Sequence, residues 1–328
     1  MLTIYYIIAL ILGFIVLLLG ADRFVDGAAN IARNFGVSPL IIGLTIVGLG
    51  TSAPEILVSA QAAFNGSPAL GVGNAIGSNI ANIGMVLGIT LLVTPLTVNS
   101  DTLKREFPIL ATVMALALIL LWDQHLGYND GLVLLTGFIL TLFGMASLAM
   151  KSSKGSPSRK ESDSKHPQPR MTTKVAILNF LVGLSGLLIA SKALVWGATG
   201  IATVLGVSEL IIGLTIVAIG TSLPELAASV VSALKNQHDI AIGNILGSNV
   251  FNILAVLAMP ALIMPSATDS ALLQRDFSVM ALLFILLFIF ARFAKDGRIG
   301  RNAGSLMLLV YITYNSLLAY QSTVGIAA

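Results

Sequence analysis

The chain has 328 residues, of which 56 % are hydrophobic and only 10 % are charged. This composition, with a mean hydropathy of +0.93, excludes an ordinary soluble domain and indicates a protein of the lipid bilayer. The net charge of +3 requires no nucleic-acid partner, and the absence of cysteine excludes disulfides and thiolate metal sites.

Runs of about 20 apolar residues predict helices that cross the membrane. In chain order we expect ten of them, five in each half, near residues 3–20, 37–64, 69–95, 105–122, 131–150, 174–191, 207–234, 239–264, 277–294 and 302–320. The first is not expected to be a cleaved signal peptide, because no Lys or Arg precedes it and no clear cleavage site follows it. The sequence therefore predicts an all-α membrane protein.

The second and third helices of the two halves share a motif. Residues 41–88 and 211–258 align without a gap at an offset of 170, and 23 of the 48 positions are identical. The identities include polar residues that are rare in lipid, as Gly-Thr-Ser-x-Pro-Glu followed by Gly-Asn-x-x-Gly-Ser-Asn-x-x-Asn. The chain is therefore a duplicated membrane unit, and each copy carries one acidic residue where acids are costly, within the bilayer.

A polar segment, residues 151–173, separates the first five-helix repeat (1–150) from the second (174–328). It is rich in Ser, Pro and charged residues, and we interpret it as a flexible linker on the cytoplasmic side. A contact with anionic lipid or a regulatory role is the alternative. The segment is too short to form a folded regulatory domain.

The distribution of Lys and Arg predicts the orientation in the cell membrane. If the N-terminus is outside, sixteen basic residues lie in inside segments, and only Lys192 and Arg275 lie outside. Both termini then face outward. Because each half has five helices, the two halves must have opposite orientations, which makes an inverted repeat with its ion site near the midplane.

A proline interrupts the second helix of each half. Pro54 and Pro224 cannot donate a backbone hydrogen bond, and each ring clashes with the carbonyl four residues earlier, at Gly50 or Gly220. Opened backbone at membrane depth is tolerated only where it is buried in protein or lines a wet cavity. We therefore expect the freed carbonyl oxygens to point inward as hard ligands.

Glu55 and Glu225 follow these prolines and place carboxylates in the bilayer, where a charge costs about 2.5–3.5 kcal/mol or more. No Lys or Arg is expected in the core of any span, so a buried ion pair is not available. Two carboxylates brought together must be neutralised by cations or by protons. We interpret them as ion ligands, and simple protonation is the alternative.

The third helix of each half adds neutral oxygens. Ser78 and Asn82 are one helical turn apart, as are Ser248 and Asn252, so each pair shares a helix face. Together with the carboxylates, carbonyls and Thr hydroxyls they could supply the 6–8 hard oxygens that Ca²⁺ takes. The alternative is that Ser and Asn here only connect neighbouring helices.

For Asn74 and Asn244 the two alternatives, ion ligation and helix packing, are equally open. Thiolate and imidazole are missing from this set, which argues against zinc or copper.

At these residues the chain resembles the calcium/cation antiporter superfamily, and specifically the prokaryotic sodium/calcium exchanger-like proteins. The resemblance covers nearly the whole chain and both copies of the motif. It implies that Ca²⁺ binds to Glu55, Glu225, Thr51 and Thr221. It also implies two flanking sodium sites, one using Thr51, Ser52 and Ser78 and the other Thr221, Ser222 and Ser248. Gly48 and Ala218 would lend backbone carbonyls to these sodium sites.

The resemblance further implies how transport proceeds. Na⁺ and Ca²⁺ compete for one set of sites that faces each side in turn, while the helices 3–20 and 174–191 slide across it as gates. Relatives with potassium-dependent transport carry an acid at the position of Asn252, so an Asn here favours potassium independence. We expect Na⁺ entry to drive Ca²⁺ export, with no cofactor and with a single chain sufficient.

Three rival functions are weighed against this one. A proton-coupled cation exchanger of the same superfamily differs only in the coupling ion, and another divalent cation such as Mn²⁺ could be the load. An intramembrane hydrolase using Glu55 and Glu225 lacks a His-Glu metal motif and a Gly-x-Ser-x-Gly elbow. A channel is disfavoured because a two-copy repeat builds one closed midplane site rather than a ring around an axis.

Overall fold

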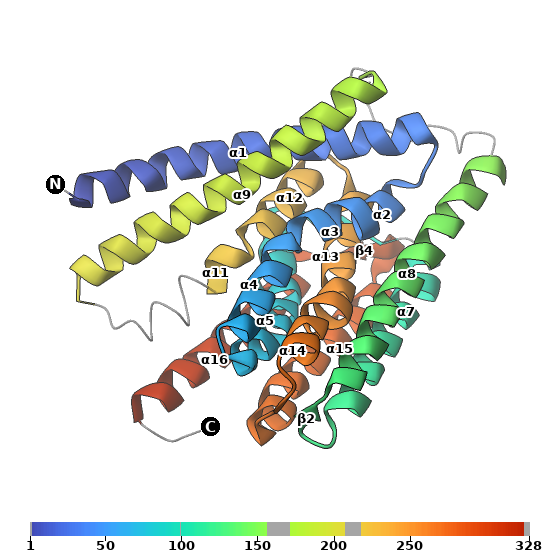
Figure 1. Cartoon of the computed structure of the whole chain (residues 1–328). Helices are drawn as coiled ribbons and strands as arrows, with labels where there is room; N and C mark the ends of the chain where they lie inside the picture. The colour runs from blue at the N-terminus through green and yellow to red at the C-terminus, as the bar shows by residue number, and fades with distance from the viewer. Residues whose placement is uncertain (1, 99, 156–170, 207–217, 325–328) are drawn as a thin grey trace.

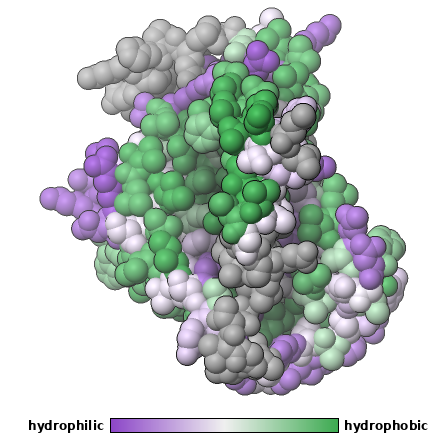
Figure 2. Space-filling model, turned by 90° about the vertical axis from the view of Figure 1, so that its left-hand side faces the viewer, coloured by the Kyte–Doolittle hydropathy of each residue, from purple (hydrophilic) through white to green (hydrophobic). Residues whose placement is uncertain are grey.

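The computed structural model describes residues 2–98, 100–155, 171–206 and 218–324, which are almost entirely helical. Seven helices in these ranges are long and apolar enough to cross a membrane, and a bent pair makes an eighth span. Figure 2 shows apolar residues over most of one face, with polar residues gathered toward its margins. The predicted all-α membrane protein is thus confirmed, while the count of ten spans stays a prediction.

Two long helices, α1 (Leu2–Phe35) and α9 (Thr173–Val204), lie side by side across the remaining bundle (Figure 1). They run antiparallel, because Gly13 of α1 contacts Leu194 whereas Gly27 contacts Phe180. At 34 and 32 residues they are much longer than a perpendicular span requires, so they must tilt steeply in the bilayer.

Both long helices extend well beyond the predicted ranges 3–20 and 174–191. The apolar run of α1 ends at Asp22, but the helix continues to Phe35, and Lys235 binds both Asp22 and Asp26 with Nζ–Oδ1 distances of 2.6 Å. In α9 the single Lys192 does not stop the helix, since the residues that follow it are again apolar or small. A charge that ends a hydropathy run therefore does not end the helix here.

The contact between α1 and α9 is made by backbone against backbone. A Cβ atom added to Gly27 would lie 2.5 Å from the nitrogen of Phe180, and one added to Gly183 would lie 2.4 Å from the nitrogen of Phe24. The rings of Phe24 and Phe180 stack beside this contact, with centroids 4.7 Å apart. Only glycine permits this separation of the two helices.

The predicted helix 37–64 is a broken one. It consists of α2 (Pro39–Ile42), a π-helical turn η1 (Gly43–Val47), α3 (Gly48–Thr51) and α4 (Ala53–Phe64), with a bend of 40° at Ser52. The next span comprises α5 (Pro68–Ala81), the π-helical turn η2 (Asn82–Leu87) and α6 (Gly88–Val93).

The second half repeats this pattern. α11 (Ala218–Thr221) and α12 (Leu223–Leu234) flank a break at Ser222, and then follow α13 (His238–Phe251), the π-helical turn η4 (Asn252–Val256) and α14 (Ala258–Ile263). Residues 207–217 of the predicted helix 207–234 lie outside the described residues.

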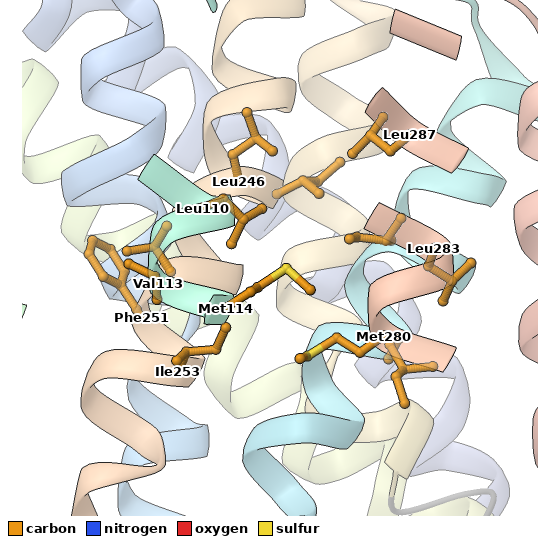
Figure 3. Close-up of a cluster of buried hydrophobic side chains, with 14 of the residues drawn as sticks. Leu110, Val113, Met114, Leu246, Phe251, Ile253, Met280, Leu283 and Leu287 are labelled. Carbon is orange, nitrogen blue, oxygen red and sulfur yellow. The ribbon is translucent and has the colours of Figure 1, made fainter. Parts of the chain in front are cut away.

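α13 occupies the centre of the molecule, and every residue from Ile240 to Phe251 is buried. It packs closely against α2 and η1 of the other half, because a Cβ at Gly243 or Gly247 would lie within 2.5 Å of a backbone oxygen of that segment. On its other side α13 meets α7 (Ser100–Leu121) and shares with it and α15 (Ser278–Arg292) the apolar core drawn in Figure 3.

The outer helices complete the bundle. They are α8 (Tyr128–Gly155) and α16 (Arg301–Val324), with the π-helical turn η5 (Leu272–Phe277) leading into α15 and the 3₁₀ turn η6 (Lys295–Gly297) following it. α8 continues to Gly155, into the range predicted as the linker, and residues 156–170 of that linker lie outside the described residues.

Four two-residue strands connect the halves at the ends of the bundle. β1 (Leu96–Thr97) pairs with β4 (Arg298–Ile299), and β2 (His125–Leu126) pairs with β3 (Ser266–Ala267), both antiparallel. β1 and β3 are equivalent positions at the offset of 170, and each pairs with a strand of the other half. The pairs join only loops that the Lys and Arg distribution assigns to the same side of the membrane.

Candidate ion-binding site

Each glutamate of the repeated motif lies in the first turn of a short helix that begins at a break. Glu55 is the third residue of α4 and Glu225 the third residue of α12, and each of these helices has a proline among its first two residues. Proline is favoured there because the nitrogen of a first-turn residue has no partner within the helix. The positive end of the helix dipole stabilises a carboxylate at this place. The breaks therefore put both acids at positive helix ends inside the bundle.

The two carboxylates are buried and close together. Glu55 and Glu225 are each 1 % exposed. The charge of Glu55 acts on the carboxylate of Glu225, and the hydroxyls of Thr51 and Ser52 lie beside that carboxylate. Among the described residues, neither glutamate forms an ion pair with Lys or Arg. The pair thus needs cations or protons to offset its repulsion.

Several buried polar atoms of the two motifs have no hydrogen-bond partner in the described part of the chain. Each such atom costs about 1–3 kcal/mol when it is left unsatisfied. Seven of these atoms belong to residues that are identical in the two copies: Oε2 of Glu55 and of Glu225, Oγ of Ser52 and of Ser222, Oδ1 of Asn252, and both amide atoms of Asn79. The other two are Oγ of Ser232 and Nδ1 of His238. Six of the seven are hard oxygens, the ligand type of Ca²⁺ and of Na⁺. The residues present therefore fit a desolvated cation.

The metal-ligand chemistry is that of oxygen alone. No group of three or more His, Asp or Glu side chains gathers anywhere in the described ranges. A cation here would be held by two carboxylates supplemented by hydroxyls, amides and backbone carbonyls, as the sequence predicts.

A π-helical turn begins at the equivalent asparagine of each half. Asn82 opens η2 and Asn252 opens η4, and both side chains are buried, as are Ser78 and Ser248 one turn earlier. Such widened turns are frequent at functional sites because they re-aim side chains and leave backbone carbonyls free. On the helix face predicted for each Ser and Asn pair, the Ser thus lies in regular α-helix and the Asn at the start of a π-helical turn.

Hydrogen bonds cross between the two halves at Thr51. Its Oγ1 lies 3.0 Å from Oδ1 of Asn244 and 3.4 Å from Oγ of Ser248. Ser248 in turn donates to the carbonyl of Gly48 at 3.5 Å. The structure therefore joins Thr51 and Gly48 of the first half to Ser248 of the second.

The equivalent residues of the second half are placed differently. Thr221 is partly exposed, whereas Thr51 is completely buried. Ala218 is the first residue of α11, next to the undescribed 207–217. The carbonyl of Gly220, expected to be a free inward ligand, instead accepts a hydrogen bond of 2.7 Å from Ser191 of α9.

Two further buried serines belong to the site, and the sequence analysis did not single them out. The amide nitrogen of Asn74 donates to the carbonyl of Glu55 and to Ser59, and Asn244 makes the same bonds to Glu225 and to Ser229. Ser59 and Ser229 are identical at the offset of 170, one turn after each glutamate, and this repetition was the signal that could have found them.

A cavity of about 720 Å³ reaches the second break from the side of α9. Its lining includes Pro54 and Thr221 at the breaks, Ser191 and Lys192 of α9, and Tyr6 of α1. The cavity thus borders both breaks, while the two glutamates beside them are not part of its lining.

A helical protein of many spans, with two buried carboxylates that have no basic partner in the described part of the chain and lie among orphaned oxygens, is a membrane transporter of cations. Comparisons with known proteins make the class specific. The family model described as sodium/calcium exchanger protein matches residues 5–146 and 175–320, so the chain belongs to the sodium/calcium exchanger protein family. It is a cation antiporter and not an enzyme, and the hydrolase alternative is therefore excluded.

Individual relatives agree over nearly the full length. The chain is 47 % identical over 312 residues to the putative antiporter CaxA of Alkalimonas amylolytica, covering 95 % of this chain and 98 % of the relative. It is 30 % identical to the sodium/calcium exchanger MaX1 of Methanosarcina acetivorans, covering 98 % and 100 %. The solved structure of the sodium-calcium exchanger NCX_Mj, soaked without Na⁺ and Ca²⁺, is similar with a TM-score of 0.82 at 35 % identity, covering 96 % and 99 %.

Proposed function

We propose that the protein exchanges Na⁺ for Ca²⁺ across the cell membrane by alternating access, independently of K⁺. The observation that carries the proposal is the pair of buried carboxylates that, among the described residues, have no basic partner and are surrounded by orphaned oxygens. One Ca²⁺ or two Na⁺ neutralise two carboxylates, so either load lets the site cross the membrane. Bare carboxylates are costly in lipid, which disfavours return of the empty carrier and enforces exchange.

The proposed ligands are the residues of the two motifs. Ca²⁺ is held by Glu55, Glu225, Thr51 and Thr221. The sodium sites draw on Ser52, Ser222, Ser78, Ser248, Asn82, Asn252 and the carbonyls of Gly48 and Ala218. The contact of Thr51 with Ser248 favours a sodium site shared between the halves, with the carbonyl of Gly48 and the carboxylate of Glu225 beside it.

The orientation belongs to the same proposal. Both termini lie outside, the segment 151–173 is cytoplasmic, and the two five-helix halves are inverted. The antiparallel α1 and α9 and the strand pairs that join same-side loops support this arrangement. The gates are α1 and α9, in place of the shorter helices expected from the sequence. One chain holds both halves of the site, so a monomer suffices.

The test is Ca²⁺ uptake into proteoliposomes loaded with Na⁺, compared with vesicles loaded with K⁺ or carrying a proton gradient. Uptake should require internal Na⁺ and should fall to background in Glu55→Gln and in Glu225→Gln. The exposed loop variant Asp123→Asn is the matched control for charge removal and should transport normally. Equal uptake under a proton gradient would establish the proton-coupled alternative, and uptake that survives Glu55→Gln would refute the site.

A further inference from the structure

Asn244 of α13 lies at the point where the two halves of the site touch. Its side chain is completely buried. The amide nitrogen donates to the carbonyl of Glu225 at 3.3 Å and to Oγ of Ser229 at 2.9 Å. The amide oxygen lies 3.0 Å from Oγ1 of Thr51 in the other half. One side chain therefore contacts the backbone of one proposed ligand and the hydroxyl of another.

This network fixes the direction of every hydrogen bond in it. A backbone carbonyl accepts only, so the amide nitrogen of Asn244 must be the atom that faces Glu225. The amide oxygen must then face Thr51, and the hydroxyl of Thr51 must donate to it. A hydroxyl has one proton, and when that proton is directed at Asn244 both lone pairs of the oxygen point elsewhere.

The direction of that proton decides whether Thr51 can bind a cation. Thr51 lies beside the carboxylate of Glu225, which is itself a strong acceptor. If the hydroxyl proton of Thr51 pointed at this carboxylate, it would lie between the hydroxyl oxygen and the bound cation and would repel the cation. A hydrogen-bond acceptor on the side of Thr51 away from the carboxylate draws the proton out of the position that the cation would occupy.

We propose that Asn244 is a positioning residue that takes the hydroxyl proton of Thr51 and so turns the oxygen of Thr51 toward the transported cation. The inference rests on the proposed function, in which Thr51 and Glu225 ligate the ion. Three other neutral oxygens are near but more distant: the carbonyls of Val47 at 3.2 Å and Gly48 at 3.3 Å, which belong to Thr51's own span, and Oγ of Ser248 at 3.4 Å. Of the contacts that make the ligand geometry of one half depend on the packing of the other, the bond to Asn244 is the shortest.

The test is a double-mutant cycle between Asn244 and Thr51, measured as the Kd for Ca²⁺ of purified protein by calorimetry in Na⁺-free detergent. Thr51→Val removes the hydroxyl at constant volume, and Asn244→Leu removes its acceptor. Each single change should raise the Kd about five- to tenfold, the effect of one net hydrogen bond between neutral groups. Because Asn244 acts through the Thr51 hydroxyl, the double variant should bind about as weakly as the weaker single variant.

The controls separate positioning from general damage. Asn74→Leu removes the equivalent hydrogen bonds of the first half, from Asn74 to the carbonyl of Glu55 and to Ser59. Because Asn74 does not bind the Thr51 hydroxyl, the factors by which Asn74→Leu and Thr51→Val raise the Kd should multiply in the double variant. In Thr51→Ser, which keeps a hydroxyl, Asn244→Leu should weaken binding as it does in the wild type. If Asn244→Leu does not fold, Asn244→Ser enters the same cycle, since it also loses the acceptor position.

Each outcome decides one point. Multiplying effects of Asn244→Leu and Thr51→Val, giving a Kd raised about twenty-five- to hundredfold, would show that Asn244 only supports the fold. An unchanged Kd in Thr51→Val and in Glu225→Gln would instead overturn the proposed ion ligands themselves. Loss of binding in these two variants combined with a multiplying cycle would leave the proposed function intact and refute the positioning role.

Discussion

Replacing Gly183 by alanine should push α1 and α9 apart. An added Cβ would lie 2.4 Å from the nitrogen of Phe24 and 2.7 Å from the carbonyl oxygen of Gly20, whereas ordinary contacts begin at 3.4 Å. Both neighbours are backbone atoms that no side-chain rotation can move. Relief therefore requires a displacement of about 1 Å between the helices, and overpacking of this kind costs about 1–3 kcal/mol.

The measurement is thermal unfolding of the detergent-purified protein, followed by tryptophan fluorescence and accompanied by Na⁺-driven Ca²⁺ uptake. Trp196, one of the two tryptophans of the chain, packs edge-on against Tyr6 of α1 with ring centroids 4.8 Å apart, so its fluorescence reports on the separation of α1 and α9 further along the pair. Gly186→Ala is the matched control, because its Cβ would lie 3.4 Å from the nearest atom. Gly183→Ala should lower the melting temperature and the uptake rate clearly more than this control. Equal behaviour of the two variants would refute the backbone-contact argument.

Two further perturbations concern charges along α1 and α9. Asp26→Asn removes the better buried of the two carboxylates bound to Lys235 and should destabilise the protein by about 1 kcal/mol. Asp22→Asn should destabilise it less, because the Asp22 side chain is 56 % exposed. A larger decrease in melting temperature for Asp22→Asn than for Asp26→Asn would contradict this order. Lys192→Gln removes a positive charge from the cavity wall and should lower the apparent KM for Ca²⁺ on that side more than the KM for Na⁺, because a divalent ion feels twice the repulsion. The difference should shrink in high salt, and equal changes in both KM values would rule out a charge effect.

Local chemistry explains what could be predicted from the sequence. Apolar runs must be helical in lipid, a proline within a helix favours a kink or a break, and an acid at membrane depth must be neutralised, so the all-α class and Glu55 and Glu225 as candidates follow without coordinates. The structure buries both glutamates without a basic partner in its described part, as expected.

Contacts between distant segments could not be predicted in this way. The bond from Thr51 to Asn244 joins residues 193 positions apart and depends on how closely α13 packs against the other half. The repeat also predicted that equivalent residues have equivalent surroundings. This does not hold where the neighbouring residues come from helices outside the motif. Ser191 binds the carbonyl of Gly220, but the position equivalent to Ser191 is Ala21, which has no hydroxyl to do the same for Gly50.

The antiparallel contact of α1 with α9 has a consequence for the order of assembly during synthesis. The glycine face of α1 is made first, but its partner is complete only when the ribosome has passed Val204. Glu55 and Thr51 likewise enter the bilayer long before Asn244 and Glu225 exist. Until the second half is inserted, the first half therefore lies in the membrane with α1 not yet packed against α9 and with Glu55 but not Glu225 in place. Its native packing is a late event, dictated by the second half and not by the order in which the spans are inserted.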